Sequence, residues 1–152
     1  MDYEVMPWHR SSWDNLMGRM TAGQLPHALL LTGPAGIGKN QFADLFTRSV
    51  LCRQPQMHGI ACGECRTCLL TRAETHPDVH WVTPPEEGKV IGVDQIREIT
   101  NYLSLKSQYG GYKLAIISPA DRLRASPPWP VAQKIQPMPH PTWVEIHAVC
   151  RS

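Results

Sequence analysis

The spacing of the hydrophobic positions changes twice in the first third of the chain. Near the N-terminus these residues recur at helical intervals, and Ser11 or Ser12 is expected to cap that helix. The run ALLLTG (28–33) is short and apolar and ends in glycine, which is typical of a buried parallel strand. Residues 39–51 return to helical spacing, with an apolar face at Phe42, Leu45, Phe46 and Val50. The order strand, loop, helix is therefore predicted for residues 28–51.

The middle of the chain repeats this alternation. VHWVT (79–83) and KLAIIS (113–118) are predicted strands, the second of them buried with a lysine at its start. Between them, Asp94 is expected to cap a helix whose apolar residues are Ile96, Ile99 and Leu103. Strands that alternate with helices indicate an α/β fold with a parallel sheet.

The character of the sequence changes after about Arg124. Six of the fourteen prolines lie in the next stretch, at Pro127, Pro128, Pro130, Pro137, Pro139 and Pro141. Proline lacks a backbone donor and blocks helix interiors, so we expect neither a long helix nor a central strand from this tail. TWVEIHAV (142–149) is expected to form at most a short extended segment.

Composition narrows the class of protein. The 152 residues suffice for one domain, and a net charge of +2 does not by itself indicate a nucleic-acid binder. No run of about 18 apolar residues occurs, and the N-terminus lacks the pattern of a secretory signal, so no membrane association is expected. We therefore expect a cytoplasmic protein, in which clustered cysteines bind metal more often than they form disulfides.

A glycine-rich loop follows the first predicted strand. Gly33, Gly38 and Lys39 match the phosphate-binding pattern G-x-x-x-x-G-K-[ST], but Asn40 stands where the pattern has Ser or Thr. The candidate phosphate-binding residues are Gly33, Gly36, Gly38, Lys39 and Asn40. In a working loop the hydroxyl at this last position ligates Mg²⁺, and a longer carboxamide displaces its oxygen from that place. We therefore interpret the loop as a degenerate phosphate loop with low nucleotide occupancy.

The strand at residues 113–118 shows a second departure. P-loop ATPases end this strand with an acidic residue that holds Mg²⁺, whereas here LAII (114–117) is followed by Ser118 and Pro119. Asp121 comes three residues late and is interpreted as a turn residue or helix cap. The two departures predict a scaffold that does not hydrolyse ATP and is not expected to bind it. Weak phosphate or nucleotide binding through the backbone amides of residues 36–39 is left open.

Cysteines cluster after the second predicted helix. Cys52, Cys62, Cys65 and Cys68 have the spacing C-x9-C-x2-C-x2-C. Three thiolates two residues apart converge from one turn, and Cys52 can complete a tetrahedral Zn²⁺ site. Four protein ligands leave no open position for a substrate, so the predicted zinc is structural.

Other interpretations of this region stay open. An iron–sulfur cluster also uses C-x2-C-x2-C, although the Cys-Pro signature of ferredoxins is missing. Unrelated buried thiols are a further alternative. Nearby, His76 and His80 are interpreted as shaping the turn into the strand at 79–83, and Cys150 as a free thiol.

Several segments together carry a resemblance to one family. They are the degenerate loop, the four-cysteine insertion after its helix, and the stretches LPHALLLTGPAGIGK, THPDVHWV, IGVDQIREI and GGYKLAIISPADRL. Over residues 8–123 the chain resembles the delta-prime subunits of bacterial DNA polymerase III clamp loaders, which are AAA+ proteins. The resemblance implies a truncated P-loop NTPase (AAA+) parallel sheet flanked by helices, with an inserted zinc module at about residues 52–68.

The family implies a role in DNA replication without catalysis by this chain. Delta-prime subunits are rigid members of a ring that helps to load the sliding clamp on primed DNA. The expected partners are clamp-loader motor and delta subunits, with the sliding clamp and primed DNA as indirect partners. The chain would then be an inactive subunit of a DNA-directed DNA polymerase holoenzyme, which is a nucleotidyltransferase. The family's arginine motif is not found in order, because VCRS (149–152) departs from it, and we assign no arginine finger.

The resemblance stops near Arg124. We expect a partial AAA+ P-loop domain at residues 1–124 and a proline-rich aberrant or disordered tail at residues 125–152. A reading-frame shift near codon 124 and an authentic short protein with a different tail are both open. The two other forward frames of the gene distinguish them, because a frame shift predicts a helix rich in Asn, Ala and Leu in one of these frames.

Two other functions compete with this interpretation. An active P-loop ATPase or kinase would use Asn40 in place of Ser or Thr, and its Mg²⁺-dependent turnover would disappear on Lys39→Ala. A small zinc-dependent nucleic-acid-binding module would bind DNA with a strong dependence on salt. The arginines around the cysteines are interspersed with Glu64 and Glu74, which leaves little net positive field for that role.

Overall fold

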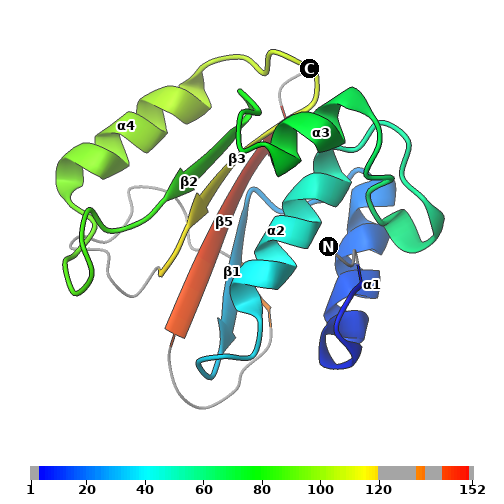
Figure 1. Cartoon of the computed structure of the whole chain (residues 1–152), viewed down its shortest axis with the longest axis horizontal. Coiled ribbons are helices and arrows are strands. Elements are labelled where there is room, and N and C mark those ends of the chain that lie inside the picture. The colour runs from blue at the N-terminus through cyan, green and yellow to red at the C-terminus, as the bar shows by residue number, and fades with distance from the viewer. Residues whose placement is uncertain (1–3, 120–132, 136–141, 151–152) are drawn as a thin grey trace. The chain divides into compact units, whose positions relative to one another are not determined.

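The computed structural model describes residues 4–119, 133–135 and 142–150. Figure 1 shows its elements. The helical elements are η1 (Pro7–His9), α1 (Arg10–Thr21), α2 (Lys39–Leu51), η2 (Met57–Gly59), α3 (Arg66–Arg72) and α4 (Val93–Ser104). The strands are β1 (Ala28–Gly33), β2 (Val79–Val82), β3 (Tyr112–Ile117), β4 (Gln133–Ile135) and β5 (Thr142–Cys150). Among the described helices, none combines the length and the hydropathy that crossing a membrane requires.

The chain forms two compact units. The first comprises Met1–Leu25 and Gln41–His76 and contains α1, η2, α3 and nearly all of α2. The second comprises Pro26–Asn40 and Pro77–Ser152 and contains the sheet and α4. The four cysteines therefore belong to the first unit, and the glycine-rich loop belongs to the second.

The strands of the second unit form one mixed sheet in the order β2-β3-β5-β1-β4. β2 and β3 are parallel, and so are β1 and β4, which agrees with the predicted α/β class. β5 lies between β3 and β1 and is antiparallel to both (Figure 1). The expectation of a parallel sheet is thus confirmed for two pairs and is wrong for β5. Because β1 and β3 both oppose β5, they run in the same direction.

The central position of β5 contradicts one prediction. We expected no central strand after residue 124, yet Thr142–Cys150 pairs along its length with both β1 and β3. The physical reason is the position of the prolines. All six prolines beyond residue 124 lie at or before position 141, so the segment that follows them keeps every backbone donor that a central strand needs. Pro127, Pro128, Pro130, Pro137, Pro139 and Pro141 lie outside the described residues.

The predicted bounds of β1 and α2 are confirmed, whereas two predicted caps are wrong. α1 begins at Arg10 after His9, so neither Ser11 nor Ser12 caps it. α4 begins after Gly92, and Asp94 lies within its first turn. The side chain of Gln95 returns to accept a hydrogen bond of 3.2 Å from the backbone of Gly92 and takes over the capping role.

An aromatic cluster forms the core of the first unit. The rings of Trp13 and Phe42 meet edge to face with centroids 5.7 Å apart, and those of Phe42 and Phe46 are stacked. The indole nitrogen of Trp13 also donates a hydrogen bond of 2.9 Å to the carbonyl of His58 in η2. This arrangement joins α1 to α2 and to the loop that leads into the cysteine region.

The core of the second unit lies between α4 and the strands. Its buried residues come from β2, α4 and β3 and from the segment before α4, namely Val82, Ile91, Ile96, Ile99, Ala115 and Ile117. Leu103 packs against this cluster from the end of α4. The predicted apolar face at Ile96, Ile99 and Leu103 is therefore confirmed.

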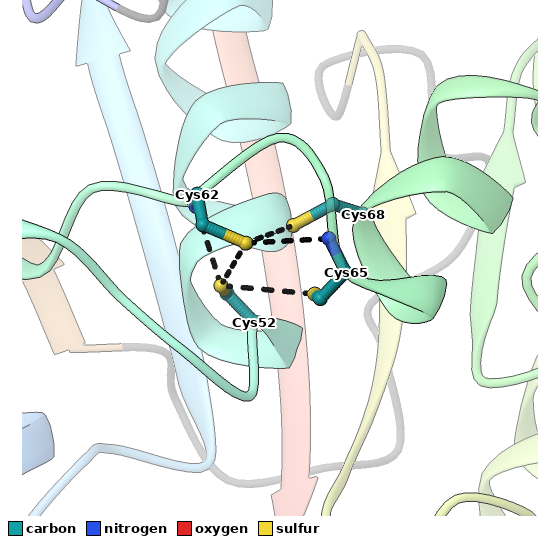
Figure 2. A group of neighbouring side chains, drawn as sticks. All are labelled: Cys52, Cys62, Cys65 and Cys68. Carbon is teal, nitrogen blue, oxygen red and sulfur yellow. Dashed lines mark hydrogen bonds between the residues drawn. The ribbon is translucent and has the colours of Figure 1, made fainter.

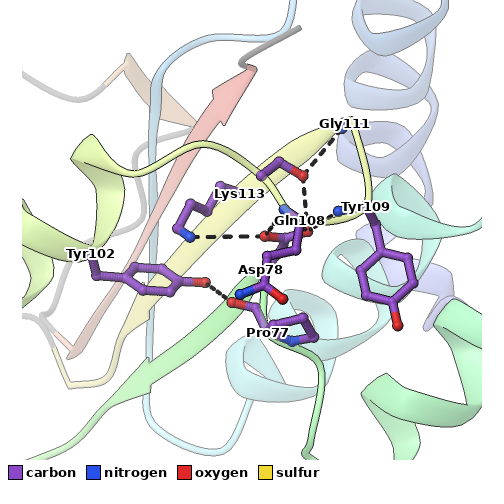
Figure 3. A network of polar contacts seen from close by, with 8 residues as sticks. Pro77, Asp78, Tyr102, Gln108, Tyr109, Gly111 and Lys113 are labelled. Carbon is purple, nitrogen blue, oxygen red and sulfur yellow. Dashed lines mark hydrogen bonds and ion pairs between the residues drawn. The ribbon is translucent and has the colours of Figure 1, made fainter.

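A buried carboxylate ties the loop before β3 to the start of β2. Asp78 accepts hydrogen bonds from the hydroxyl of Ser107 (2.8 Å) and from the backbone of Gln108 (2.9 Å) and Tyr109 (3.0 Å). The ammonium of Lys113 lies 3.8 Å from the same carboxylate, and both side chains are buried (Figure 3). Burial opposes ionisation, but these hydrogen bonds and the lysine charge hold the pKa of Asp78 below its ordinary value.

Tyr102 completes this network from α4. Its hydroxyl donates a hydrogen bond of 3.0 Å to the carbonyl of Pro77, and the ammonium of Lys113 lies 4.1 Å from the centre of its ring. Figure 3 shows the lysine between the tyrosine and the carboxylate. A lysine buried at the start of a strand is thus held by an opposite charge and an aromatic face.

Candidate functional site

Four cysteines from three parts of the first unit come together in space. Cys52 follows the last turn of α2, Cys62 and Cys65 lie in the loop before α3, and Cys68 lies within α3. All four sulfur atoms lie within 4.8 Å of one another, and Figure 2 shows them converging on one point. The expected cluster of four cysteines therefore forms, and it could hold a metal ion.

The sulfur separations fit a tetrahedral metal. The Cys52 sulfur lies 3.6 Å from that of Cys62 and 4.0 Å from that of Cys65, and those of Cys62 and Cys68 lie 4.0 Å apart. Zinc–sulfur bonds of about 2.3 Å in a regular tetrahedron place neighbouring sulfurs about 3.8 Å apart. The donor set and these three separations thus fit a four-thiolate metal site.

Backbone hydrogen bonds hold the loop in this geometry. The amide of Cys62 points at the Cys52 sulfur (3.3 Å), and the amide of Cys65 points at the Cys62 sulfur (3.4 Å). One residue earlier, the amide of Ala61 donates to the buried hydroxyl of Ser49 in α2 (3.1 Å). Two of these contacts hold the loop against α2 and Cys52, and the third joins two ligands within the loop.

The electrostatic environment differs between the thiols. At Cys65, burial opposes ionisation, but hydrogen bonds from the Thr67 hydroxyl and from the backbone of Arg53 and Cys68 lower its pKa to about 5. Burial raises the pKa of Cys68 and of Cys52 above the ordinary thiol value. Metal ions bind the thiolate, so a cation at the centre would draw the remaining protons off.

The two nearby histidines do not join this group among the described residues. His76 is buried at the end of the first unit, and His80 lies on β2, where its ring centre is 5.2 Å from that of Tyr102. The interpretation of both histidines as residues around the turn stays a prediction. The side chain of Cys150 lies outside the described part of the chain.

The second unit carries the glycine-rich loop between β1 and α2. Gly36 and Gly38 have φ angles of +81° and +87°, a region that side chains other than glycine rarely adopt. Lys39 is buried, and its ammonium donates hydrogen bonds to the loop's own carbonyls at Gly33 (2.9 Å) and Pro34 (2.7 Å). The ammonium of Lys39 is thus held by the backbone of the loop itself.

The two residues that depart from the phosphate-loop pattern contact each other. β1 and β3 run in the same direction, so Asn40 and Ser118 follow their carboxyl ends at the same edge of the sheet. The hydroxyl of Ser118 donates a hydrogen bond of 2.7 Å to Oδ1 of Asn40. Neither group carries the negative charge that Mg²⁺ prefers in its ligands. Asp121 lies outside the described residues.

Comparison with known proteins identifies the family. The family model described as "DNA polymerase III, delta subunit" matches residues 8–127. The chain belongs to this family. The DNA polymerase III subunit delta' of Pseudomonas aeruginosa is 40% identical over 123 residues, which cover 81% of this chain and 36% of that protein. The delta' subunit of Escherichia coli K12 is 34% identical over 137 residues, which cover 90% of this chain and 41% of that protein.

A more distant relative has a different name. The DNA polymerase III subunit tau/gamma of Haemophilus influenzae is 26% identical over 132 residues, which cover 77% of this chain and 18% of that protein. The chain thus spans about two fifths or less of the length of these relatives. The family resemblance seen in the sequence is confirmed.

Sequence reasoning about this family member missed several contacts around both sites. Asn40 and Ser118 were each identified as a departure, but the hydrogen bond between them was not predicted. Ser49 and Thr67 carry no motif, and only the fold brings their hydroxyls to the cysteine region. The sequence did indicate the buried ion pair in part, because a lysine at the start of a strand predicted to be buried needs a compensating charge.

Proposed function

We propose that this chain provides a non-hydrolysing, delta'-type part of the DNA polymerase III clamp loader in the cytoplasm. The observation that carries this role is the family match over residues 8–127, together with relatives named as delta' subunits. The match covers 36% and 41% of the first two relatives, so the activity and partners of the complete subunit are part of the proposal. Its task is to help load the sliding clamp on primed DNA.

The proposed scaffold is an AAA+ P-loop domain, partial at residues 1–124, whose sheet is joined by β5 from the proline-rich tail at residues 125–152. Three features support it: β1 leads through a glycine-rich loop into α2, β1 and β3 run in the same direction, and both end at the edge that carries the loop. Ligands of open α/β sheets bind at the carboxyl ends of the strands. Gly33, Gly36, Gly38, Lys39 and Asn40 are the residues that would meet a phosphate, with low occupancy.

The geometry of Asn40 and Ser118 supports the absence of hydrolysis. In working P-loop ATPases a hydroxyl after the lysine and an acidic group after the third strand hold Mg²⁺. Here a hydroxyl follows the strand and a carboxamide follows the lysine, and the two are hydrogen-bonded to each other at 2.7 Å. A cation would have to displace this contact, and it would gain no carboxylate ligand from either residue.

We propose that Cys52, Cys62, Cys65 and Cys68 bind one structural Zn²⁺. The sulfur separations of 3.6–4.0 Å support a four-thiolate site. The ion would supply a cross-link between the end of α2 and the start of α3, and no open coordination position for chemistry. Metal analysis of the purified chain tests this, because about one zinc per chain is expected, and an iron chromophore or no metal would overturn it.

The proposed direct partners are clamp-loader motor and delta subunits, and the sliding clamp and primed DNA are indirect ones. The relatives support the clamp-loader setting, since one of them carries the name tau/gamma and others the name delta'. Neither an active ATPase nor a nucleic-acid-binding module is favoured by these relatives.

An assembly experiment tests the role. Purified chain would be mixed with the tau/gamma-type and delta-type subunits from the same organism and examined by sedimentation velocity. A complex that contains the chain and both subunits is expected. If the folded chain sediments alone at micromolar concentrations of both subunits, the clamp-loader role is wrong for this chain.

A further inference from the structure

A threonine hydroxyl lies directly on the cysteine centre. The Oγ1 atom of Thr67 is 3.1 Å from the sulfur of Cys65, and the residue is only 3% exposed. Thr67 belongs to the first turn of α3, and Cys65 is the residue that precedes that helix. The contact is therefore fixed by the helix start and does not depend on a mobile surface side chain.

The direction of this hydrogen bond follows from the chemistry of the sulfur. In the free thiol either atom could donate. A sulfur that binds a metal carries no proton, so the hydroxyl of Thr67 must then be the donor. Its own carbonyl already accepts a hydrogen bond of 2.7 Å from the hydroxyl of Thr71, one turn later in α3.

The charge of the centre explains why such a donor matters. A Zn²⁺ ion with four thiolates carries a net double negative charge, and a partly buried charge needs hydrogen-bond donors around it. Backbone amides supply donors to all four sulfurs, and Cys65 has a side-chain hydroxyl in addition. The donors at Cys52 and Cys62 are the backbone amides of Cys62 and Cys65, which cannot be removed without replacing a ligand. One donor to the Cys65 sulfur is the hydroxyl of Thr67, which a substitution can remove.

We propose that Thr67 is a positioning residue of the metal centre, whose hydroxyl orients the Cys65 sulfur, spreads its negative charge and so sets how tightly the centre holds zinc. The inference rests on the proposed zinc site. It adds a determinant of affinity that lies outside the four ligands. Outer hydrogen bonds of this kind commonly change metal affinity by about 10–100-fold.

Three variants separate the hydroxyl from the helix that carries it. Thr67→Val keeps the shape of the side chain and removes the donor. Thr67→Ser keeps the donor and removes the methyl group. Thr71→Val is the matched control, because it removes a buried hydroxyl from the same helix without touching a sulfur.

Zinc affinity by competition with a chromogenic chelator is the first measurement, made on the full chain. We expect Thr67→Val to bind zinc about tenfold more weakly, and Thr67→Ser and Thr71→Val to match the wild type. Equal loss in Thr71→Val would assign the effect to helix stability, and equal loss in Thr67→Ser would assign it to packing of the methyl group. Either result overturns the proposal.

Cobalt substitution provides a readout that a purely structural role would not move. The sulfur-to-cobalt charge-transfer band reports the electron density on the sulfurs, so removing a hydrogen bond to one of them shifts the band to longer wavelength. This shift is expected in Thr67→Val alone. A wild-type band in Thr67→Val with unchanged zinc affinity contradicts the role of Thr67, whereas a wild-type chain that binds neither metal contradicts the zinc site itself.

Discussion

The hydroxyl of Ser118, which follows β3, donates a hydrogen bond of 2.7 Å to Oδ1 of Asn40 in the first turn of α2. These are the two residues that depart from the pattern of a working phosphate loop. Ser118 is buried and Asn40 is exposed, so the bond links a buried residue after β3 to the exposed start of α2. The two departures therefore act together, as a neutral pair in place of a hydroxyl and a carboxylate.

Replacing both members of this pair should restore a metal site. Asn40→Thr combined with Ser118→Asp places a hydroxyl after the loop lysine and a carboxylate after β3, which are the two protein ligands of Mg²⁺ in P-loop ATPases. We expect nucleotide affinity in the presence of Mg²⁺ to rise about tenfold or more, since charged interactions of this kind contribute about 1.5–3 kcal/mol. Titration with a fluorescent ATP analogue, with Mg²⁺ and with chelator, measures the change.

The single substitutions are the controls for the pair. Ser118→Asp alone places a carboxylate against Oδ1 of Asn40, and Asn40→Thr alone leaves no acidic ligand, so neither should gain Mg²⁺-dependent affinity. Equal gains from a single substitution and from the double one would show that the hydrogen-bonded pair is not what excludes the metal.

The loop itself could be predicted from the sequence, but the pairing of its two departures could not. An apolar run followed by glycines and an amphipathic segment fixed β1 and α2 at their observed bounds. Asn40 and Ser118 are 78 positions apart, and only the sheet brings the ends of β1 and β3 to one edge. The local spacing of residues along the chain does not predict a contact between positions so far apart in the sequence.

The buried ion pair of the second unit should dominate its stability. Asp78→Asn removes the charge that compensates Lys113, which is 3% exposed, and we expect a loss of about 3 kcal/mol at pH 7. Asp94→Asn is the control, because Asp94 is 98% exposed and its contact with Arg97 is 3.6 Å, so no measurable change is expected. Urea unfolding of both variants beside the wild type measures the difference.

The same carboxylate predicts a pH dependence. The pKa of Asp78 is lowered in the folded chain, so its stabilisation is complete above the unfolded value of about 3.9 and is lost as pH falls through the folded value. The wild type should therefore approach the stability of Asp78→Asn only below pH 4. If the difference in stability between the wild type and Asp78→Asn already disappeared between pH 7 and pH 5, the pKa of Asp78 would not be lowered in the folded chain.

A glycine fixes the loop before the cysteines. A Cβ atom on Gly59 would lie 2.6 Å from the sulfur of Met17, and its φ angle of +73° disfavours other residues. We expect Gly59→Ala to destabilise the chain by about 2 kcal/mol. Gly18→Ala, in α1 with nothing within 4 Å, should instead stabilise it by about 0.5–1 kcal/mol. Thermal unfolding that moves in the same direction for both variants would contradict this account.

The cysteine centre predicts a selective effect of thiol substitution. Cys65→Ser should lower zinc retention and the melting temperature, because it removes one of four converging ligands. Cys150→Ser should leave zinc content unchanged. Metal analysis after dialysis against a mild chelator compares them, and equal zinc loss in both variants would remove the basis for the assignment of the four ligands.

There are physical reasons why α3, β5 and two helix caps could not be predicted from the sequence. α3 has only seven residues and is held by the cysteine region, so its apolar spacing is too short to be recognised. β5 was not predicted because the tail is rich in proline. All of these prolines precede β5, however, and proline blocks a central strand only where it lies within that strand. The helix caps at His9 and Gly92 were not predicted, because η1 leads directly into α1 at His9 and the Gln95 side chain caps α4 at Gly92.

Steady-state phosphate release tests the central claim most directly. The wild type would be measured beside Lys39→Ala with ATP and Mg²⁺, in the presence and absence of DNA. Each missing catalytic group commonly lowers the rate by about 10²–10³-fold, and both metal-holding groups are replaced here, so both proteins should release phosphate at the same background rate. Turnover by the wild type that disappears in Lys39→Ala would contradict the non-hydrolysing scaffold and identify the chain as an active P-loop enzyme.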